Sequence, residues 1–234
     1  MKKRRYDQCI FSKQTEKYRN ENKKAFLDFI IKETNKSKLL DLGCSDGKFT
    51  KKIASVIGTD KIYGIEVNKN LAKKAKEKGI KVKISDLNKK FPFKNETFDI
   101  VSANQVIEHV WDTDNFFKEV KRVLKKGGYS IISTVNLSSF HSIFFILLGQ
   151  QTPVINLTDV QVGNCLRGYY AKGHYHQKAF NIPVLKDLSE YYGFKIESIK
   201  GNSFYFCPKL LQKLLSNIVG KYAIYLTMRI RKVD

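Results

Sequence analysis

The chain has 234 residues, of which 42% are hydrophobic, and this suits one α/β domain with an ordinary buried core. No apolar run follows the basic start, and the most apolar stretch, Ile143–Leu148, is too short to cross a bilayer. We therefore expect a cytoplasmic protein. The cysteines form no CxxC pair, which argues against a zinc site or a disulfide framework; they are Cys9, Cys44, Cys165 and Cys207.

The net charge of +21 comes from 43 Lys and Arg against 22 Asp and Glu, and most of the basic residues are lysines. Lysine suits a solvated surface better than bidentate recognition of phosphates or bases, for which arginine is preferred. Residues 1–40 carry 12 basic and 5 acidic side chains, residues 41–119 carry 15 and 12, and residues 120–234 carry 16 and 5. The basic flanks fit either a solvated surface or an anionic partner such as acidic lipid or nucleic acid.

Helix and strand patterns alternate along the first 134 residues with short connections, which predicts a mostly parallel, doubly wound α/β sheet. After residue 134 an apolar segment, 136–149, and an irregular stretch, 150–176, interrupt the alternation. The expected helices are 16–34, 48–56, 70–78, 114–124 and 184–192, and the expected strands are 38–42, 61–65, 81–85, 98–103, 129–134 and 194–199.

The first strand ends in LDLGCSDG, residues 40–47, a tight strand-to-helix turn that lets a ligand lie against the backbone. It departs from the GxGxxG pattern of dinucleotide sites because the middle glycine is missing. Asp41 would also repel a pyrophosphate, so a nicotinamide dehydrogenase is disfavoured. A carboxylate at this position suits a ligand with a cationic group or hydroxyls.

Acidic residues also follow the second and third strands, and parallel strands place their carboxyl ends along one edge of the sheet. Glu66 lies 23 residues beyond Gly43, where an acid can accept hydrogen bonds from both ribose hydroxyls. Asp86 can accept from an exocyclic adenine amine, while the Leu87 amide donates to a ring nitrogen. Three carboxylates in this arrangement suit a phosphate-free adenosine that carries a positive charge.

The runs LDLGCSDG, GIEV, ISDL, FDIVSANQVIEHV and LKKGGYSIIST, over about residues 38–135, resemble the class I S-adenosylmethionine-dependent methyltransferases, small-molecule (type 11) subgroup. The resemblance implies a Rossmann-like sheet with an antiparallel C-terminal strand, an N-terminal helix and a lid insertion. It implies a single domain, 1–234, with a helical segment (1–37), a cofactor-binding core (38–135), a lid (136–183) and a C-terminal helix, strand and basic tail (184–234).

The same resemblance implies the roles of individual residues around S-adenosylmethionine. The departure is Ser45, where the family usually has glycine, so we expect modestly altered affinity. The implied contacts are Asp41, Gly43, Cys44 and Gly47 along the methionine part, Glu66 at the ribose with Val67 against adenine, Asp86 and Leu87 at the adenine edge, and Asn104 near the methionine moiety and the acceptor.

His109 follows the fourth strand and is the first candidate for contacting the acceptor or acting as its base, or it simply stabilises the turn. His174 and His176 would share one face of a strand, but no third ligand presents itself. Glu108–His109 resembles the pair found in some metal-assisted members of the family, yet Gln105 is a weaker ligand than an acid there. We therefore expect no metal.

The acceptor is expected to be a small or lipid-linked molecule, because 140–148 could cover an apolar pocket or face a membrane. The tail could add peripheral contact with an anionic bilayer. A nucleic-acid methyltransferase is an alternative favoured by the basic flanks, although ANQVIEH replaces the signature for base amines. A non-catalytic cofactor-binding subunit is another. The tail residues are Leu210, Leu211, Leu214, Leu215, Tyr222 and Tyr225, beside Lys209, Lys213 and Lys221.

Overall fold

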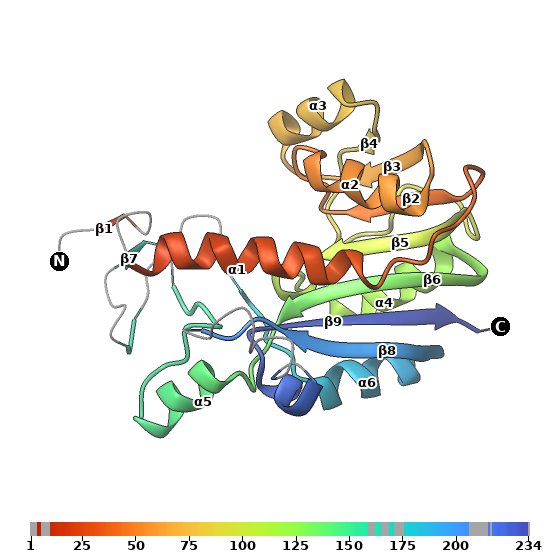
Figure 1. The fold of residues 1–234 in the computed structure, drawn as a ribbon. Coiled ribbons are helices and arrows are strands. Elements are labelled where there is room, and N and C mark those ends of the chain that lie inside the picture. Colours follow the sequence, from red (N-terminus) through yellow and green to blue (C-terminus); the bar gives the residue numbers. More distant parts are fainter. Residues whose placement is uncertain are drawn as a thin grey trace.

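The computed structural model describes residues 4–5, 10–158, 162–164, 169–170, 176–205, 215 and 217–233 (Figure 1). The helices are α1 (Ile10–Leu27), α2 (Lys48–Ile57), α3 (Lys69–Glu77), η2 (Ile107–His109), α4 (Thr113–Val123), α5 (Phe140–Leu147), α6 (Ile182–Tyr191) and η3 (Gly220–Tyr222). The strands are β1 (Arg4–Arg5), β2 (Lys38–Leu42), β3 (Lys61–Ile65), β4 (Lys81–Lys83), β5 (Phe98–Asn104), β6 (Leu124–Val135), β7 (Tyr169–Tyr170), β8 (Phe194–Asn202) and β9 (Tyr225–Lys232).

Seven strands form one sheet in the order β4-β3-β2-β5-β6-β9-β8, and β9 is the strand that runs antiparallel to its neighbours. The order reverses between β2 and β5, which pair directly although β3 and β4 lie between them in the chain. In such sheets ligands bind beyond the carboxyl ends of the strands at the reversal. The expected mostly parallel sheet with an antiparallel C-terminal strand is confirmed.

Alternate residues of the central strands enter two separate hydrophobic cores, one on each face of the sheet. Leu39 and Ile100 pack with α2, α3 and the end of α1, while their neighbours Leu40 and Val101 pack with α4 and α6. Both faces are therefore covered, which explains why these strands read as short continuous apolar runs.

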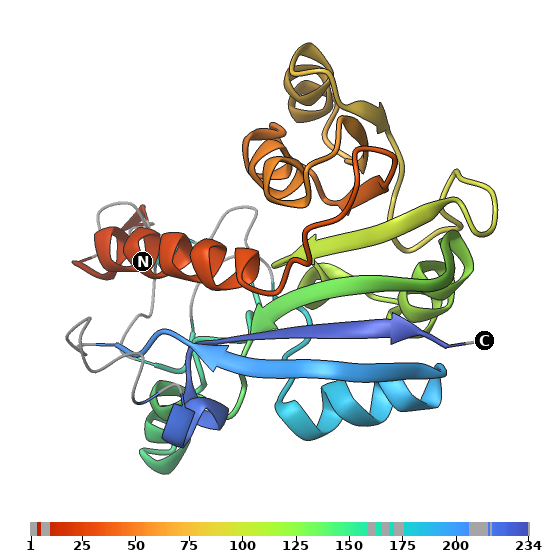
Figure 2. The ribbon, with the colours of Figure 1, turned by 45° about the vertical axis from the view of Figure 1, so that its right-hand side comes forward.

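The N-terminal helix begins and ends earlier than its pattern predicted, since α1 ends at Leu27 instead of residue 34. Figures 1 and 2 show α1 lying beside β5 and β6, with its first half projecting past their carboxyl ends. Its buried side chains include Tyr18, Asn22 and Phe26. The helix thus reaches the edge where ligands bind in this fold.

The C-terminal tail expected to contact a bilayer is partly a core strand. Tyr225 begins β9 and is buried, so the prediction that it contacts lipid is wrong. The alternation of apolar and basic residues in β9 reflects pairing with β6 and β8 on its two sides. Leu210, Leu211, Leu214, Lys209 and Lys213 lie outside the described residues. Within the described chain, no helix combines the length and apolar character needed to cross a membrane.

The junction between β8 and η3 allows no side chain at Gly201. A Cβ there would lie 1.9 Å from the carbonyl oxygen of Gly220 and 2.8 Å from the Ala223 Cβ. Gly201→Ala should therefore lower the free energy of unfolding by about 1–3 kcal/mol or more, as overpacking does, measured by urea denaturation. The control Gly220→Ala meets nothing nearer than 3.6 Å and should cost much less; equal losses would contradict this account.

Candidate active site

The turn after β2 is built from residues in the left-handed region of the backbone map. Gly43 has φ +66°, Ser45 +50° and Gly47 +78°, and α2 starts directly after Gly47. A Cβ at Gly43 would lie 2.9 Å from Val106 Cγ2, and one at Gly47 would lie 2.6 Å from Ile80 Cδ1. Glycine is therefore required at both positions, whereas Ser45 adopts a conformation that costs an L-residue about 1–2 kcal/mol.

The amides of this turn donate hydrogen bonds within the chain. Gly43 and Cys44 both donate to the carbonyl oxygen of Ile65, at 2.9 and 3.1 Å, and Ser45 donates to Glu66 Oε2 at 2.9 Å. These groups are already satisfied, so the turn does not present them to a phosphate. Two further amides are satisfied locally: Gly47 donates to the Cys44 carbonyl, and Lys48 donates to Asp46 Oδ1.

Glu66 joins the turn after β2 to the turn after β3. Its side chain is 8% exposed, and its second oxygen, Oε1, accepts from the Asn68 amide at 2.8 Å. Each carboxylate oxygen can accept a further bond, so the group can serve a ligand while it holds both loops. The next residue, Val67, is 68% exposed and free to cover a ligand with its apolar side chain.

Asp41 lies beneath the turn, where its carboxylate accepts from Thr50 Oγ1 at 2.5 Å and from Ser102 Oγ at 2.6 Å. Burial is the largest influence and raises the pKa of Asp41 to about 6; the two hydroxyls oppose the rise and the charge of Glu66 adds to it. Two acidic groups without a cationic partner thus produce a negative potential under the glycine turn.

The Cys44 side chain faces the core. Burial raises the pKa of its thiol to about 12, so the sulfur stays protonated. It packs on β3, because a Cβ at Gly64 would lie 2.6 Å from Cys44 Sγ. Cys44 can therefore line a ligand with its backbone and not with its sulfur.

The loop after β4 is tied to the loop after β5. Asp86 Oδ1 accepts from the backbone and side-chain nitrogens of Asn88, at 2.9 and 2.8 Å. Asn88 Oδ1 in turn accepts from the amides of Trp111 and Asp112, at 2.7 and 3.1 Å. Leu87, beside Asp86, packs against the core under α4. The predicted adenine side is therefore a braced loop.

Asn104 ends β5 and is held by α1, a contact that the sequence did not suggest. Asn22 Nδ2 donates to Asn104 Oδ1 at 3.1 Å, and Asn22 Oδ1 accepts from Ser133 Oγ at 3.1 Å. Asn22 is buried despite its polar side chain. A polar residue at an otherwise apolar helix position was the only available signal, and it did not identify the partner 82 residues away.

The short helix η2 brings a buried carboxylate to the same edge. Glu108 is 0% exposed; its Oε2 accepts from Thr134 Oγ1 at 3.0 Å, while Oε1 has no hydrogen-bond partner among the described residues. Burial raises the pKa of Glu108 to about 7, against the lowering effect of its hydrogen bonds. This orphaned oxygen is the least satisfied acidic group described at the site.

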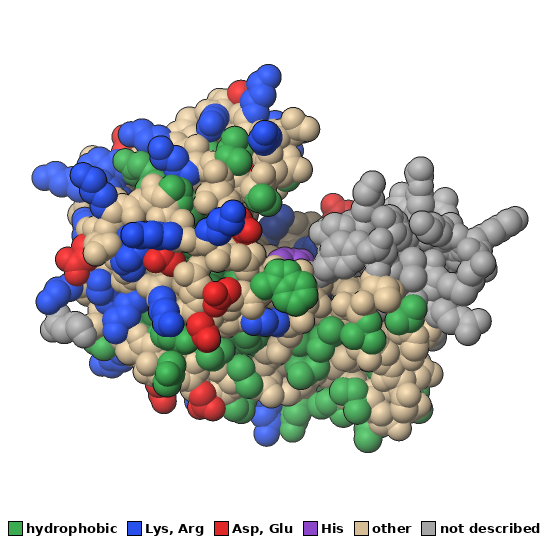
Figure 3. All heavy atoms as spheres, turned by 180° about the vertical axis from the view of Figure 1, so that it is seen from behind, with side chains coloured by type: hydrophobic (Ala, Val, Ile, Leu, Met, Phe, Trp, Pro, Cys, Tyr) green, Lys and Arg blue, Asp and Glu red, His purple; other side chains and the backbone are tan. Residues whose placement is uncertain are grey.

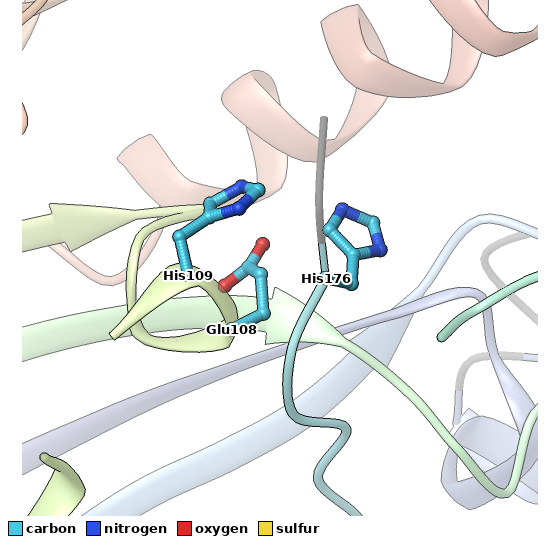
Figure 4. Close-up of side chains that lie close together, drawn as sticks. All are labelled: Glu108, His109 and His176. Carbon is cyan, nitrogen blue, oxygen red and sulfur yellow. The ribbon is translucent and has the colours of Figure 1, made fainter. Parts of the chain in front are cut away.

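His109 and His176 gather around Glu108, although 67 residues separate the two histidines (Figure 4). Their rings lie 5.1 Å apart, and one ligand atom from each of the three residues lies within 4.8 Å of the others. The sequence offered no third ligand beside His174 and His176, whereas the fold brings Glu108 and His109 to His176. His174 lies outside the described residues.

The protonation of Asp41 links stability to pH. Since its pKa in the folded protein lies above the ordinary 3.8, the folded protein binds this proton more tightly than the unfolded chain, and stability falls as pH rises through 4 to 6. Asp41→Asn should lack this loss. The variant's free energy of unfolding should gain on the wild type by up to about 3 kcal/mol between pH 4 and 7, at 1.36 kcal/mol per pKa unit. Urea denaturation across this range measures it, and a constant difference would refute it.

The chain is similar to known proteins over the part that carries these features. Residues 40–132 match the methyltransferase domain family. An uncharacterized protein of Methanocaldococcus jannaschii is 34% identical over 137 residues, 56% of this chain and 63% of that protein. A ubiquinone biosynthesis O-methyltransferase of Pelagibacter ubique is 34% identical over 133 residues, 53% of this chain and 54% of that enzyme. The chain thus spans between half and two thirds of these relatives.

A crystal structure from Thermotoga maritima, described as an S-adenosylmethionine-dependent methyltransferase and possible histamine N-methyltransferase, superposes with a TM-score of 0.62 at 20% identity. The match covers 95% of this chain and 96% of the other. The shared sheet, the matched family and the acidic edge agree with one another. The chain belongs to the class I S-adenosylmethionine-dependent methyltransferases.

Proposed function

We propose that this protein transfers the methyl group of S-adenosylmethionine to a small or lipid-linked acceptor. The observation that carries the proposal is the acidic edge of Asp41, Glu66 and Asp86 beside a glycine turn whose amides are satisfied within the chain. A site of this kind fits a cationic nucleoside and does not fit a pyrophosphate. When bound, the cofactor supplies a methyl group on a positively charged sulfur, already activated for transfer to a nucleophile.

The residues at the strand ends would divide the cofactor between them. Glu66 has the position and spare acceptor capacity to bind the ribose, and Val67 to cover the adenine. Asp86 and Leu87 would hold the adenine edge. The remaining contacts lie along the methionine part: Asp41 through the potential under the turn, Gly43, Cys44 and Gly47 through the backbone, and Asn104 through its side chain.

The protein's own contribution to such a transfer is alignment and electrostatics. The turn after β2 is fixed to β3 by three backbone hydrogen-bond donors, so the ligand meets a rigid wall. His109 lies at the neighbouring edge, after β5, where it would contact the acceptor or take its proton. An O-methyltransferase among the relatives supports a hydroxyl as the attacked group.

Glu66→Ala should weaken binding of S-adenosylhomocysteine by about tenfold or more, because a charge-assisted pair of hydrogen bonds is lost. Titration calorimetry measures the affinity. Glu66→Gln keeps one acceptor oxygen and should lose less. Glu77→Gln, at the exposed end of α3, is the matched control and should bind as the wild type does. Unchanged affinity in Glu66→Ala would remove the ribose assignment.

An exposed apolar surface supports the lipid-linked version of the acceptor. Residues 136–158 contain no Asp, Glu, Lys or Arg, in a chain that is 28% charged. On α5, Leu147 is 79% exposed and Phe144 is 59% exposed. Figure 3 shows apolar side chains gathered at its lower right and most lysine and arginine side chains toward its left. Apolar side chains on a protein of net charge +21 suit the surface of an anionic bilayer.

The double variant Phe144→Ser, Leu147→Ser should bind vesicles of phosphatidylcholine and phosphatidylglycerol several-fold more weakly than the wild type, measured by flotation at moderate salt. Val56→Ser on α2 removes an exposed apolar side chain elsewhere and should change nothing. A wild type that ignores these vesicles and methylates only water-soluble acceptors would exclude the lipid-linked acceptor, while leaving the cofactor assignment intact.

A further inference from the structure

We propose that Glu108, His109 and His176 bind a divalent transition-metal ion at the acceptor side of the site. The three side chains offer one carboxylate oxygen and two imidazole nitrogens within 4.8 Å of one another (Figure 4). Metal–ligand bonds to such atoms are about 2.0–2.2 Å, so small side-chain rotations bring all three onto one ion. The segments that carry them meet only in the folded chain.

The buried carboxylate is the first argument for a cation. A fully buried ionised oxygen without a partner costs several kcal/mol, and buried charges are normally paired or coordinated to a metal. No arginine or lysine hydrogen bond or ion pair to Glu108 is present among the described residues, and Oε1 is the oxygen left unpaired. Thr134 holds the other oxygen, Oε2, and so orients the carboxylate.

The tautomer of His176 is the second argument. Its Nδ1 lies 2.9 Å from the carbonyl oxygen of Val154, which can only accept, so Nδ1 carries the proton. Nε2 is therefore the nitrogen with the lone pair. Histidines that bind metals commonly donate their other ring nitrogen to a carbonyl in this way, which fixes both tautomer and ring orientation.

The backbone fixes the distance between the two segments. The amides of Gln177 and Lys178 both donate to the carbonyl oxygen of Glu108, at 2.9 and 3.2 Å. Lys178 Nζ also donates to the Trp111 carbonyl at 2.6 Å and to Thr113 Oγ1 at 2.8 Å. His176 is thus held against η2 before any ion arrives, which lowers the entropic cost of forming the site.

The donor set selects the class of ion and its role. Two imidazoles and one carboxylate favour Zn²⁺, Co²⁺, Mn²⁺ or Fe²⁺ over Mg²⁺ and Ca²⁺, which prefer oxygen ligands. Three protein ligands leave coordination positions open for the substrate. Resting on the proposed function, the ion would bind an acceptor hydroxyl and lower its pKa, so that its proton leaves to water and the oxygen is ready to attack. His109 would then act as a ligand to the ion instead of a free base.

Co²⁺ is the probe, because its visible absorption reports on coordinating nitrogens. Titrating metal-stripped protein with Co²⁺ should give one saturable site with d–d bands. His176→Gln and Glu108→Gln should each weaken this binding by about tenfold or more, since even loss of a supporting residue costs 10–100-fold. His141→Gln removes a histidine of α5 outside the cluster and should keep the wild-type affinity. Circular dichroism melting checks that each variant folds.

Two further readouts keep the outcomes separate. Adding catechol, a hydroxyl-bearing probe, should shift the Co²⁺ bands of the wild type if coordination positions are open. S-adenosylhomocysteine affinity should stay unchanged in His176→Gln, so failure of the cofactor assignment is seen independently of the metal. The proposal is overturned if wild type shows no saturable Co²⁺ site, or if the site survives in both ligand variants.

Discussion

The grip of β3 on the turn after β2 is the interaction on which the site depends. The carbonyl of Ile65 and the carboxylate of Glu66 together take the amides of three consecutive residues, from Gly43 to Ser45. This satisfies donors that would otherwise attract a phosphate, and it holds Ser45 in a left-handed conformation that serine disfavours. One acidic side chain therefore both shapes the turn and selects against anionic ligands.

The same device recurs around the edge of the sheet: each loop is held by a polar group of another loop. Asn88 holds the loop after β5, Asn22 of α1 holds Asn104, and the Glu108 carbonyl holds the segment after His176. Loops on a parallel sheet have little hydrophobic area to pack, so hydrogen bonds to backbone groups set their positions. The result is one connected rim with a cofactor side and an acceptor side.

The charge of the molecule and the charge of its site have opposite signs. The chain carries +21, yet the acids under the glycine turn have no basic partner, and burial holds the pKa of Asp41 at about 6. Exposed lysines are screened by salt within about 10 Å, whereas buried acids are not. Net charge thus describes the solvated surface, and the buried residues decide what the site attracts.

By itself the sequence determined the β2–β6 half of the sheet, the glycine turn and the acidic residues at the strand ends, because these depend on local patterns of apolar residues and turn chemistry. Tertiary structure alone decided that the basic tail contains a core strand with a buried Tyr225, that Asn22 braces Asn104, and that His176 joins Glu108 and His109. Those contacts join residues 67 or more positions apart, and no local pattern encodes which distant partner a side chain meets.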